Sequence, residues 1–312
     1  IFMKKVIVTG GLGYVGSLLS KKLIKKGYEV IILDNFFTNT EKKIDGAKII
    51  KCDITKSSSL DKIKIKNVQA VLHLAAQSSG PKSFEEPDLD VQVNVLGTVN
   101  LINFCKKNKV NKFIYASSFT VYGDNKSTEI LNEESSCNPK SFYAVSKYAS
   151  EKYLQILCEK FSIRWNIIRM FNVYGPGQDM NRVDQGIVSI YLNYIKNHKI
   201  LPVKGSLERF RDLIYIDDVI EAWILCLEDK RNYNQIFNLG SGEKTYVKDM
   251  IKEIIKLYKK ENKIKVKVVD STPGDIKGCY ANIEKIKRCL SFKPKVKFKS
   301  GIKTFKKWVD ES

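Results

Sequence analysis

The stretch TGGLGYVG at residues 9–16 decides the fold of this 312-residue chain. It follows a short β-branched strand predicted at 5–9 and opens a helix predicted at 14–26, where apolar residues recur at helical spacing. Glycines let the backbone turn tightly and let a pyrophosphate approach the helix N-terminus, where unpaired N–H groups and the helix dipole favour anions. We therefore predict a pyrophosphate site, rather than an ordinary strand-to-helix turn, on Gly10, Gly13 and Gly16.

An acidic residue stands at the end of the next predicted strand, 29–33. Asp34 follows Gly16 by 18 residues, and a carboxylate at this place can accept hydrogen bonds from both hydroxyls of an adenosine ribose. The same carboxylate would repel the 2′-phosphate of NADP, and neither Asn35 nor Phe36 offers a compensating arginine. The sequence therefore predicts NAD as the cofactor.

The first part of the chain alternates strands and helices. Long helices are predicted at 89–107 and 141–161, and further strands at 47–51, 70–74, 112–117 and 165–170. Near-continuous apolar strands separated by helices indicate a parallel sheet covered on both faces. We predict an α/β fold with a Rossmann-type doubly wound parallel sheet, whose ligands bind at the carboxyl ends of the strands.

The pattern becomes mixed in the rest of the chain. Helices are predicted near 183–197, 217–229, 245–260 and 282–289, and short strands near 213–216, 235–239 and 264–269. Clusters of glycine and proline separate them. We predict an NAD-binding Rossmann domain at 3–171 and a smaller, mixed α/β substrate-binding lobe at 172–312, with some later segments returning to the first domain.

Lysine dominates the charge of the chain. Lysine and arginine total 54 against 34 acidic residues, which gives a formal net charge of +20, and only seven of the basic residues are arginine. The lysines are spread along the polar faces of the predicted helices. We interpret them as a solvated surface that attracts anionic substrates, and we do not expect nucleic-acid binding.

Cysteine and histidine are too few or too scattered for a disulfide framework or a metal site. The seven cysteines are odd in number and form no CxxC, and the chain has two histidines. We interpret Met3 as the native start, and neither a signal peptide nor a run of about 18 apolar residues follows it. A cytoplasmic location without membrane attachment is expected.

Tyr143 and Lys147 lie four residues apart on the predicted helix 141–161, and therefore on one face. An ammonium beside a phenol favours the phenolate and lowers the tyrosine pKa from its usual value of about 10. Such a tyrosine could take a proton from a hydroxyl. Ser118 follows the strand 112–117, where the ligand crevice is expected, and its hydroxyl could hold the substrate oxygen.

Ten ordered segments, which together span nearly the whole chain, resemble one family, the extended short-chain dehydrogenase/reductases. The resemblance is to their NAD-dependent nucleotide-sugar epimerases and dehydratases, of the type of UDP-glucose 4-epimerase. The segments are TGGLGYVG at 9–16, CDI at 52–54, HLAAQ at 73–77, NVLGT at 94–98, SSFTVYG at 117–123, YAVSK at 143–147, RMFNVYGP at 169–176, RDLIYIDDV at 211–219, FNLGSG at 237–242 and PGD at 273–275.

The resemblance implies roles for individual residues. Tyr143 would be the general base and acid, Lys147 would hold the nicotinamide ribose, and Ser118 would position the reacting hydroxyl. The implied cofactor contacts are Gly10, Gly13, Tyr14, Val15, Gly16, Asp34, Asn35, Asp53, Ile54, Leu74, Ala75, Ala76, Gln77, Asn94 and Lys147. The implied substrate contacts are Ser118, Thr120, Tyr143, Asn172 and Arg211, of which the last two would contact the diphosphate.

Two departures from the family pattern bear on the reaction. The dehydratases carry Asp-Glu where this chain has Phe119 and Thr120. Since phenylalanine cannot protonate a leaving hydroxyl, 4,6-dehydration is disfavoured. The family often reads Arg-Pro-Gly-Asp late in the chain, whereas Thr272 precedes Pro273 here, so one expected phosphate-binding arginine is missing.

The function that the resemblance implies is oxidation at a sugar hydroxyl, at C4, of a nucleoside-diphosphate sugar, with return of the hydride as in an epimerase. One alternative is a 4-dehydrogenase that releases the keto sugar. Another is a non-enzymatic NAD sensor or nucleic-acid binder on the same fold, which the net charge would suit. A homodimer is also implied, through the helices 89–107 and 141–161, with apolar contact from Tyr153, Leu154 and Leu157.

Structural explanations stay open for several of these residues. His73 is expected to pack at a strand end rather than to catalyse. Asn172 could cap a turn, and Asp53 could cap a helix at 57–64. Arg211 could pair with Asp212, Asp217 or Asp218.

Overall fold

A computed structural model describes residues 4–38, 43–124 and 130–312, so that Met3 lies outside the described residues. Its centre is a seven-stranded parallel sheet with the order β12-β7-β5-β4-β1-β2-β3. This arrangement confirms the predicted Rossmann-type fold. The strands are β1 (Lys5–Thr9), β2 (Glu29–Asp34), β3 (Ala47–Lys51), β4 (Val68–His73), β5 (Lys112–Ser118), β7 (Arg164–Met170) and β12 (Gln235–Leu239).

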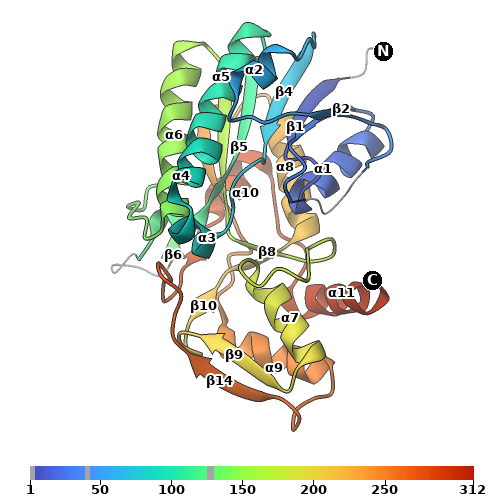
Figure 1. The fold of residues 1–312 in the computed structure, drawn as a ribbon, viewed down its shortest axis with the longest axis vertical. Coiled ribbons are helices and arrows are strands. Elements are labelled where there is room, and N and C mark those ends of the chain that lie inside the picture. The colour runs from blue at the N-terminus through green and yellow to red at the C-terminus, as the bar shows by residue number, and fades with distance from the viewer. Residues whose placement is uncertain (1–3, 39–42, 125–129) are drawn as a thin grey trace.

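Helices cover both faces of the sheet, because successive strand residues point to opposite sides. In β1, Val6 and Val8 belong to one apolar cluster and Ile7 to the other. Figure 1 shows the two layers of helices on either side of the sheet. The first cluster includes residues of α1 (Tyr14–Lys25), α8 (Ile216–Glu228) and α10 (Glu284–Leu290), and the second includes residues of α2 (Ser57–Asp61), α5 (Gly97–Lys107) and α6 (Phe142–Lys160).

The strand order reverses beside β1, which pairs with β2 on one side and with β4 on the other. At such a point the connecting loops leave in opposite directions, which opens a crevice outside the carboxyl ends of the strands. The glycine-rich turn after β1, the segment after β4 and the end of β5 therefore converge at one edge of the sheet. The motifs that were singled out in the sequence occupy this edge.

The helix predicted over 89–107 differs from the observed one. The chain forms α3 (Gly80–Glu85) and α4 (Pro87–Asp90), continues as a π-helical segment over Val91–Leu96, and becomes α-helical again in α5. A π segment holds one extra residue per turn and is common at functional sites. It contains Asn94, which the resemblance assigned to the cofactor site.

The smaller lobe is built from short strands and helices, below the sheet in Figure 1. Five of them, the strands β8, β9, β10 and β13 and the helix α11, were not predicted. Its elements are β8 (Asn172–Tyr174), α7 (Ile187–Asn197), β9 (Ile200–Lys204), β10 (Phe210–Arg211), β11 (Leu213–Tyr215), β13 (Thr245–Tyr246), α9 (Val247–Leu257), β14 (Lys265–Val269) and α11 (Phe298–Glu311). Outside the lobe, Phe119–Tyr122 forms a 3-10 turn, and β6 (Ile130–Leu131) pairs with β15 (Tyr280–Ala281).

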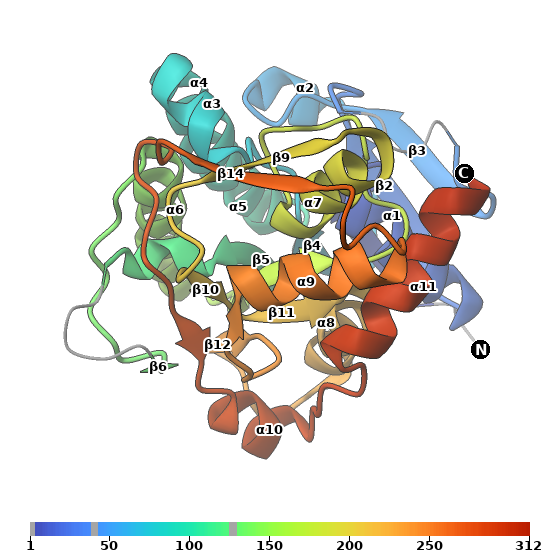
Figure 2. The same cartoon turned by 90° about the horizontal axis from the view of Figure 1, so that it is seen from below.

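The lobe and the sheet share one continuous apolar core. Trp223 of α8, Leu192 of α7 and Phe305 of α11 all belong to the cluster that also contains Val6 and Val8 of β1. The chain also returns to the main sheet, because β12 follows β8 to β11 of the lobe in sequence but pairs with β7. The division into 3–171 and 172–312 stays a prediction, and the return of a later segment agrees with it. Figure 2 shows α9 and α11 lying across the lower end of the molecule. Among the described residues, none of the helices is both long and apolar enough to cross a membrane.

A buried ion pair ties α6 to the sheet. Arg169 of β7 is 2% exposed and donates two hydrogen bonds to Glu151 of α6, of 3.0 and 2.7 Å, and Glu151 is fully buried. The hydroxyl of Ser117 at the end of β5 donates to the same carboxylate over 2.5 Å. Because each charge has lost its hydration, each depends on the other for compensation.

Removal of one member of this pair should therefore be costly. We expect Glu151→Gln to lower the free energy of unfolding by about 3–5 kcal/mol, because it leaves the Arg169 guanidinium buried without a counter-charge. The double variant Glu151→Leu with Arg169→Met should recover most of that loss. Urea denaturation measures both, and Asp61→Asn, which breaks the exposed pair with Lys107, should cost less than about 1 kcal/mol. A cost for Glu151→Gln as small as that of the control would contradict this account.

Candidate active site

The glycine-rich turn is packed too tightly for side chains. Gly10 has a φ of +64°, and a Cβ on it would lie 2.7 Å from the backbone nitrogen of Ala75. A Cβ on Gly16 would collide with the carbonyl oxygen of Gly10, to which the N–H of Gly13 also donates over 3.1 Å. The turn that leads into α1 is thus left without side chains at Gly10, Gly13 and Gly16. This is the open helix terminus that a pyrophosphate needs.

The structure fixes Asp34 against this turn. Its two carboxylate oxygens accept hydrogen bonds from the backbone N–H groups of Leu12 at 3.0 Å and Phe36 at 2.8 Å, and the side chain is almost fully buried. Asn35 is exposed, and its side-chain oxygen accepts from the N–H of Phe37. Asp34 therefore lies at the carboxyl end of β2 next to the glycine-rich turn, where a ribose contact was predicted.

Tyr14 links the glycine-rich turn to the smaller lobe. Its hydroxyl donates to the carbonyl oxygen of Gly175 over 3.0 Å, and a Cβ on Gly177 would lie 3.7 Å from its ring. Val15, the next residue of α1, is half-buried and packs on the core. The cofactor turn and the chain that enters the lobe are thus held together by one side chain.

Asp53 does not cap a helix. One of its oxygens accepts from the N–H of Thr55 at 3.0 Å and from the Thr55 hydroxyl at 2.7 Å, while α2 begins after Lys56. Ile54 is buried, and a Cβ on Gly97 would lie 2.7 Å from its side chain. The Asp53 turn stands after β3, beside Asp34 at the same edge of the sheet, since β2 and β3 pair in parallel.

The segment after β4 is bonded to α6 through Asn94. The Asn94 side chain accepts from the N–H of Gln77 at 3.0 Å and donates to the hydroxyl of Ser146 on α6 at 2.9 Å. Because the amide of Asn94 is buried and already engaged, its geometry suits a residue that positions the segment rather than one that touches the cofactor. The predicted contacts in the same segment that stay half-exposed are Leu74, Ala75 and Ala76.

Ser118, Thr120 and Tyr143 form one hydrogen-bonded group. The Ser118 hydroxyl accepts from the N–H of Thr120 at 3.2 Å and from its hydroxyl at 2.9 Å. Burial raises the pKa of Tyr143 to about 12, although a hydrogen bond with Ser118 lowers it, and the charge of Asp90 raises it further. The structure thus brings together the three residues that were predicted to face the reacting hydroxyl.

Lys147 is buried without an acidic partner in contact. Its side chain is 3% exposed, and its ammonium lies 4.6 Å from the centre of the Tyr115 ring. Burial lowers the pKa of Lys147 to about 7, and the charges of Glu151 and Asp90 oppose this shift. The expectation that Lys147 lowers the pKa of Tyr143 is therefore wrong for this structure, because burial disfavours both the phenolate and the ammonium.

The structure assigns Arg211 a partner that the sequence did not indicate. Its guanidinium donates to Asp275 over 2.8 Å, and to the carbonyl oxygens of Phe210 and Lys277. Asp212 turns away from it and accepts four hydrogen bonds, from Ser241 N, Ser241 Oγ, Gly242 N and Ala281 N. The alternative that Arg211 pairs with Asp212 is therefore wrong.

Two other expected residues are accounted for. Asn172 is half-buried, and its side chain donates to the carbonyl oxygen of Asp212 over 3.2 Å, at the first residue of β8. His73 is buried between the hydroxyls of Thr9 at 2.7 Å and Thr98 at 3.0 Å. His73 thus packs at the end of β4, as expected.

Residues that were not predicted complete the site. Asp90 is buried and accepts hydrogen bonds from Gln77, Asn94 and Ser146. Glu151 lies four residues after Lys147 on α6, and Arg209 lies two residues before Arg211. A spacing of four suits one face of a helix, and a spacing of two suits one face of an extended chain. These spacings from Lys147 and Arg211 are the signal that could have indicated Glu151 and Arg209.

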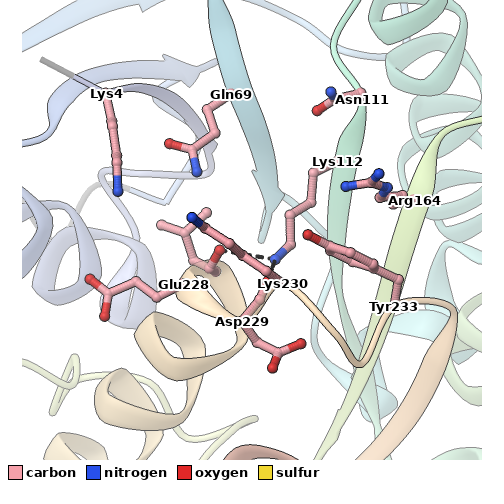
Figure 3. Close-up of a pocket in the computed structure, with 10 residues that line it drawn as sticks. Lys4, Gln69, Asn111, Lys112, Arg164, Glu228, Asp229, Lys230 and Tyr233 are labelled. Carbon is pink, nitrogen blue, oxygen red and sulfur yellow. Dashed lines mark hydrogen bonds between the residues drawn. The ribbon is translucent and has the colours of Figure 1, made fainter. Parts of the chain in front are cut away.

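A cavity of about 250 Å³ lies at the other edge of the sheet (Figure 3). It is lined by residues at the amino ends of the strands, including Gln69, Asn111 and Arg164. There Lys112 donates to the carbonyl oxygens of Cys226, Leu227 and Asp229, and thus caps the end of α8. This cavity is remote from the motifs, so we assign it to packing. Among the described residues, no group of His, Cys, Asp and Glu could hold a metal ion.

Comparison with known proteins gives one consistent result. A family model described as the NAD dependent epimerase/dehydratase family matches residues 6–240. The structure of UDP-glucose 4-epimerase with UDP-glucose from Thermotoga maritima superimposes with a TM-score of 0.92, at 29% identity, and the match covers 98% of this chain and 99% of that one.

Two further similarities broaden the range of activities. The structure of UDP-N-acetylglucosamine 4-epimerase from Methanobrevibacter ruminantium, in complex with UDP-N-acetylmuramic acid, has a TM-score of 0.90 at 33% identity, over 100% of this chain and 99% of that one. The dTDP-D-glucose 4,6-dehydratase of Bos taurus is 31% identical over 328 residues, which are 100% of this chain and 90% of that protein. The similar proteins thus include both epimerases and dehydratases.

Because the ammonium of Lys147 is buried, we predict that its removal raises the free energy of unfolding by an amount that depends on pH. In nucleotide-free protein the folded pKa of about 7 lies below the unfolded value of 10.5, so the unfolded state holds more protons between these values and the wild type becomes more stable as pH rises. We expect Lys147→Met to exceed the wild type in free energy of unfolding at pH 6–7. The difference should shrink by up to about 1.4 kcal/mol per pH unit toward pH 10.

Urea denaturation at several pH values measures this difference, and the exposed Lys152→Met is the control, for which no pH-dependent difference is expected. A constant difference for Lys147→Met across the pH range would show that the ammonium is not destabilised by burial.

Proposed function

This chain belongs to the NAD dependent epimerase/dehydratase family, and on that premise we propose that it epimerises C4 of the sugar of a nucleoside diphosphate. The observation that carries the proposal is the group of Ser118, Thr120 and Tyr143. It offers hydroxyls to a reacting oxygen and contains no carboxylic acid. UDP-hexoses are the proposed substrates, because the similar epimerases are named for UDP-sugars.

NAD suits the residues that line the predicted cofactor site. The glycine-rich turn that leads into α1 would receive the pyrophosphate, Asp34 the adenosine ribose, and Lys147 the nicotinamide ribose. The ribose hydroxyls would give Lys147 the hydrogen-bond acceptors that the protein does not provide. Bound NAD supplies a hydride acceptor and, in its reduced form, a hydride donor.

The protein's own part in the reaction is to move one proton and to hold one oxygen. Tyr143 Oη takes the proton of the sugar O4 hydroxyl and later returns it, while Ser118 Oγ holds the same oxygen in place. Burial raises the pKa of Tyr143 to about 12 in the nucleotide-free protein, so the bound ligands would have to lower this pKa before the phenolate forms. A ketone at C4 that turns over before the hydride returns gives the epimer.

Elimination of water lacks an acid at this site. Phe119 stacks on Phe171 with ring centres 5.3 Å apart, and the Thr120 hydroxyl donates to Ser118. Neither side chain can protonate a leaving hydroxyl at C6. We therefore place this chain with the epimerases rather than the dehydratases, although it is similar to both.

An exposed apolar strip on α6 supports a homodimer. Phe142, Val145, Tyr153 and Ile156 are each about half exposed or more, and their spacing places them on one helical face. Leu154, which was predicted to take part, is instead buried in the core. A continuous apolar face of this kind is the usual signature of a protein contact. We propose that two copies pair through α6, in the cytoplasm, where the free cysteines would stay reduced.

The reaction is tested with UDP-glucose, UDP-galactose, UDP-N-acetylglucosamine and UDP-glucuronic acid, followed by NMR and by NADH absorbance. We expect interconversion of C4 epimers without net NADH. Tyr143→Phe should lower kcat by about 10²–10⁴-fold, because it removes the group that moves the proton, and leave UDP affinity within about threefold. The matched control Tyr148→Phe should keep its activity.

Other products would redirect the assignment. A keto sugar with stoichiometric NADH would identify a 4-dehydrogenase, and a 4-keto-6-deoxy sugar would identify a dehydratase. If no sugar reacted and Tyr143→Phe changed nothing, the proposal of an enzyme would be wrong, and an NAD sensor would be the better assignment.

The dimer is tested by light scattering coupled to size-exclusion chromatography. We expect the wild type to run as a dimer and Ile156→Glu as a monomer at micromolar concentration, because a carboxylate in the centre of the strip would lose its hydration on pairing. Gln155→Glu adds the same charge to another face of this helix and should stay dimeric. A wild type that runs as a monomer would refute the dimer.

A further inference from the structure

Two arginines share a single carboxylate in the smaller lobe. Arg209 stands directly before β10 and Arg211 is the second residue of that strand, and both side chains reach the same carboxylate. Each guanidinium forms an ion pair with one of the two oxygens of Asp275. The arginines are 8% and 7% exposed, so the cluster is almost fully withdrawn from water.

The charges of this cluster do not balance. Two guanidinium groups face one carboxylate, and Asp212 is turned toward Ser241 and Gly242. Burial lowers the pKa of Arg211 to about 10, and the charge of Arg209 lowers it further; burial likewise lowers the pKa of Arg209. An uncompensated buried charge is costly, and a second anion between the arginines would remove that cost.

The protein provides a built setting for the two side chains. The Arg209 Nε donates to the carbonyl oxygen of Ser206 over 3.2 Å, and Arg211 donates to the carbonyl oxygens of Phe210 and Lys277. Arg209 also forms a hydrogen bond with Tyr191, and both arginines bond to Asp275. Because a guanidinium carries five N–H groups, these partners among the described residues do not use all of them. The forks are thus oriented by the backbone and still have donors to offer.

The cluster lies beside the start of the catalytic helix. A Cβ on Gly274, the neighbour of Asp275, would lie 2.6 Å from the carbonyl oxygen of Lys140 and 3.2 Å from the side chain of Ser141, which caps α6. Tyr143 stands in the first turn of that helix. Figure 1 shows β10 between the sheet-containing body and the end of the smaller lobe. An anion bound there would therefore lie near the first turn of α6, which carries Tyr143.

We propose that Arg209 and Arg211 together bind the diphosphate of the sugar nucleotide, with Asp275 as the residue that positions both forks. Planar guanidiniums match phosphate oxygens in bidentate geometry, and a diphosphate carries enough charge to neutralise the surplus. Arg209 would thus provide the second cation in a chain that has Thr272 before Pro273. This inference rests on the proposed function, since it assigns a diphosphate ligand to the same site.

The test compares nucleoside diphosphates with their parent nucleosides. UDP, dTDP, GDP and CDP are titrated by calorimetry, and uridine, thymidine, guanosine and cytidine by NMR, into wild type and Arg209→Gln. We expect Arg209→Gln to weaken the best-bound diphosphate about 10–100-fold and to change the affinity for its nucleoside less than twofold. A defect in folding alone would weaken both ligands together. Unchanged NAD affinity checks the fold.

A matched control removes the same charge nearby. Lys248 lies in α9, where its exposed ammonium pairs with Glu208. Lys248→Gln should leave diphosphate affinity within about twofold. Equal losses in the two variants would overturn the inference in favour of long-range attraction. If Arg209→Gln does not fold, Arg209→Lys, which keeps the charge but not the fork, should still weaken the diphosphate selectively.

The outcomes separate this inference from the proposed function. A wild type that binds none of the four diphosphates would refute the proposed function itself. If the wild type binds one of the diphosphates and Arg209→Gln binds it with the same affinity, only the role of Arg209 would be refuted. The epimerase proposal would then stand.

Discussion

Burial of a polar helix face is the constraint on which this structure depends. Ser146, Lys147, Ser150 and Glu151 all point from α6 into the protein, and each buried polar group needs a partner. Glu151 finds Arg169 on the sheet, whereas Ser146 and Ser150 bond to Asn94 in the π segment. Lys147 has no hydrogen-bond acceptor among the described residues. The network that satisfies its neighbours holds it rigidly, and so prepares the place for a ligand.

A shared apolar core and one hydrogen bond join the smaller lobe to the sheet. The smaller lobe has no apolar core of its own, because its helices and the first face of the sheet belong to one cluster. Tyr14 adds a polar bond from the glycine-rich turn to Gly175. Asn172 and Arg211, the proposed substrate contacts, are therefore placed relative to Tyr143 by continuous packing, which is what the proposed reaction at one carbon would require.

Local patterns predicted most of the fold and the catalytic group, whereas long-range pairings did not emerge from them. Strands with near-continuous apolar residues were located to within a residue or two. The π segment was missed because an i to i+5 ladder leaves no simple periodicity. Tyr143 and Lys147 were found from their spacing, but their pKa values depend on burial, which one sequence does not reveal. Likewise, the partner of Arg211 stands 64 positions away.

The π segment also fixes the phase of the helix around it. An α-helix turns about 100° per residue, and the wider π turn takes up an extra residue while the α-helices on either side keep their faces. A deletion between Asp90 and Asn94 would bring the two residues one position closer, so that they could no longer bond together to Gln77 and Ser146. The extra residue thus keeps the side chains of two successive stretches of helix directed at the same hydrogen-bond partners. Single-residue deletions here would be tolerated far less than in the connecting loops.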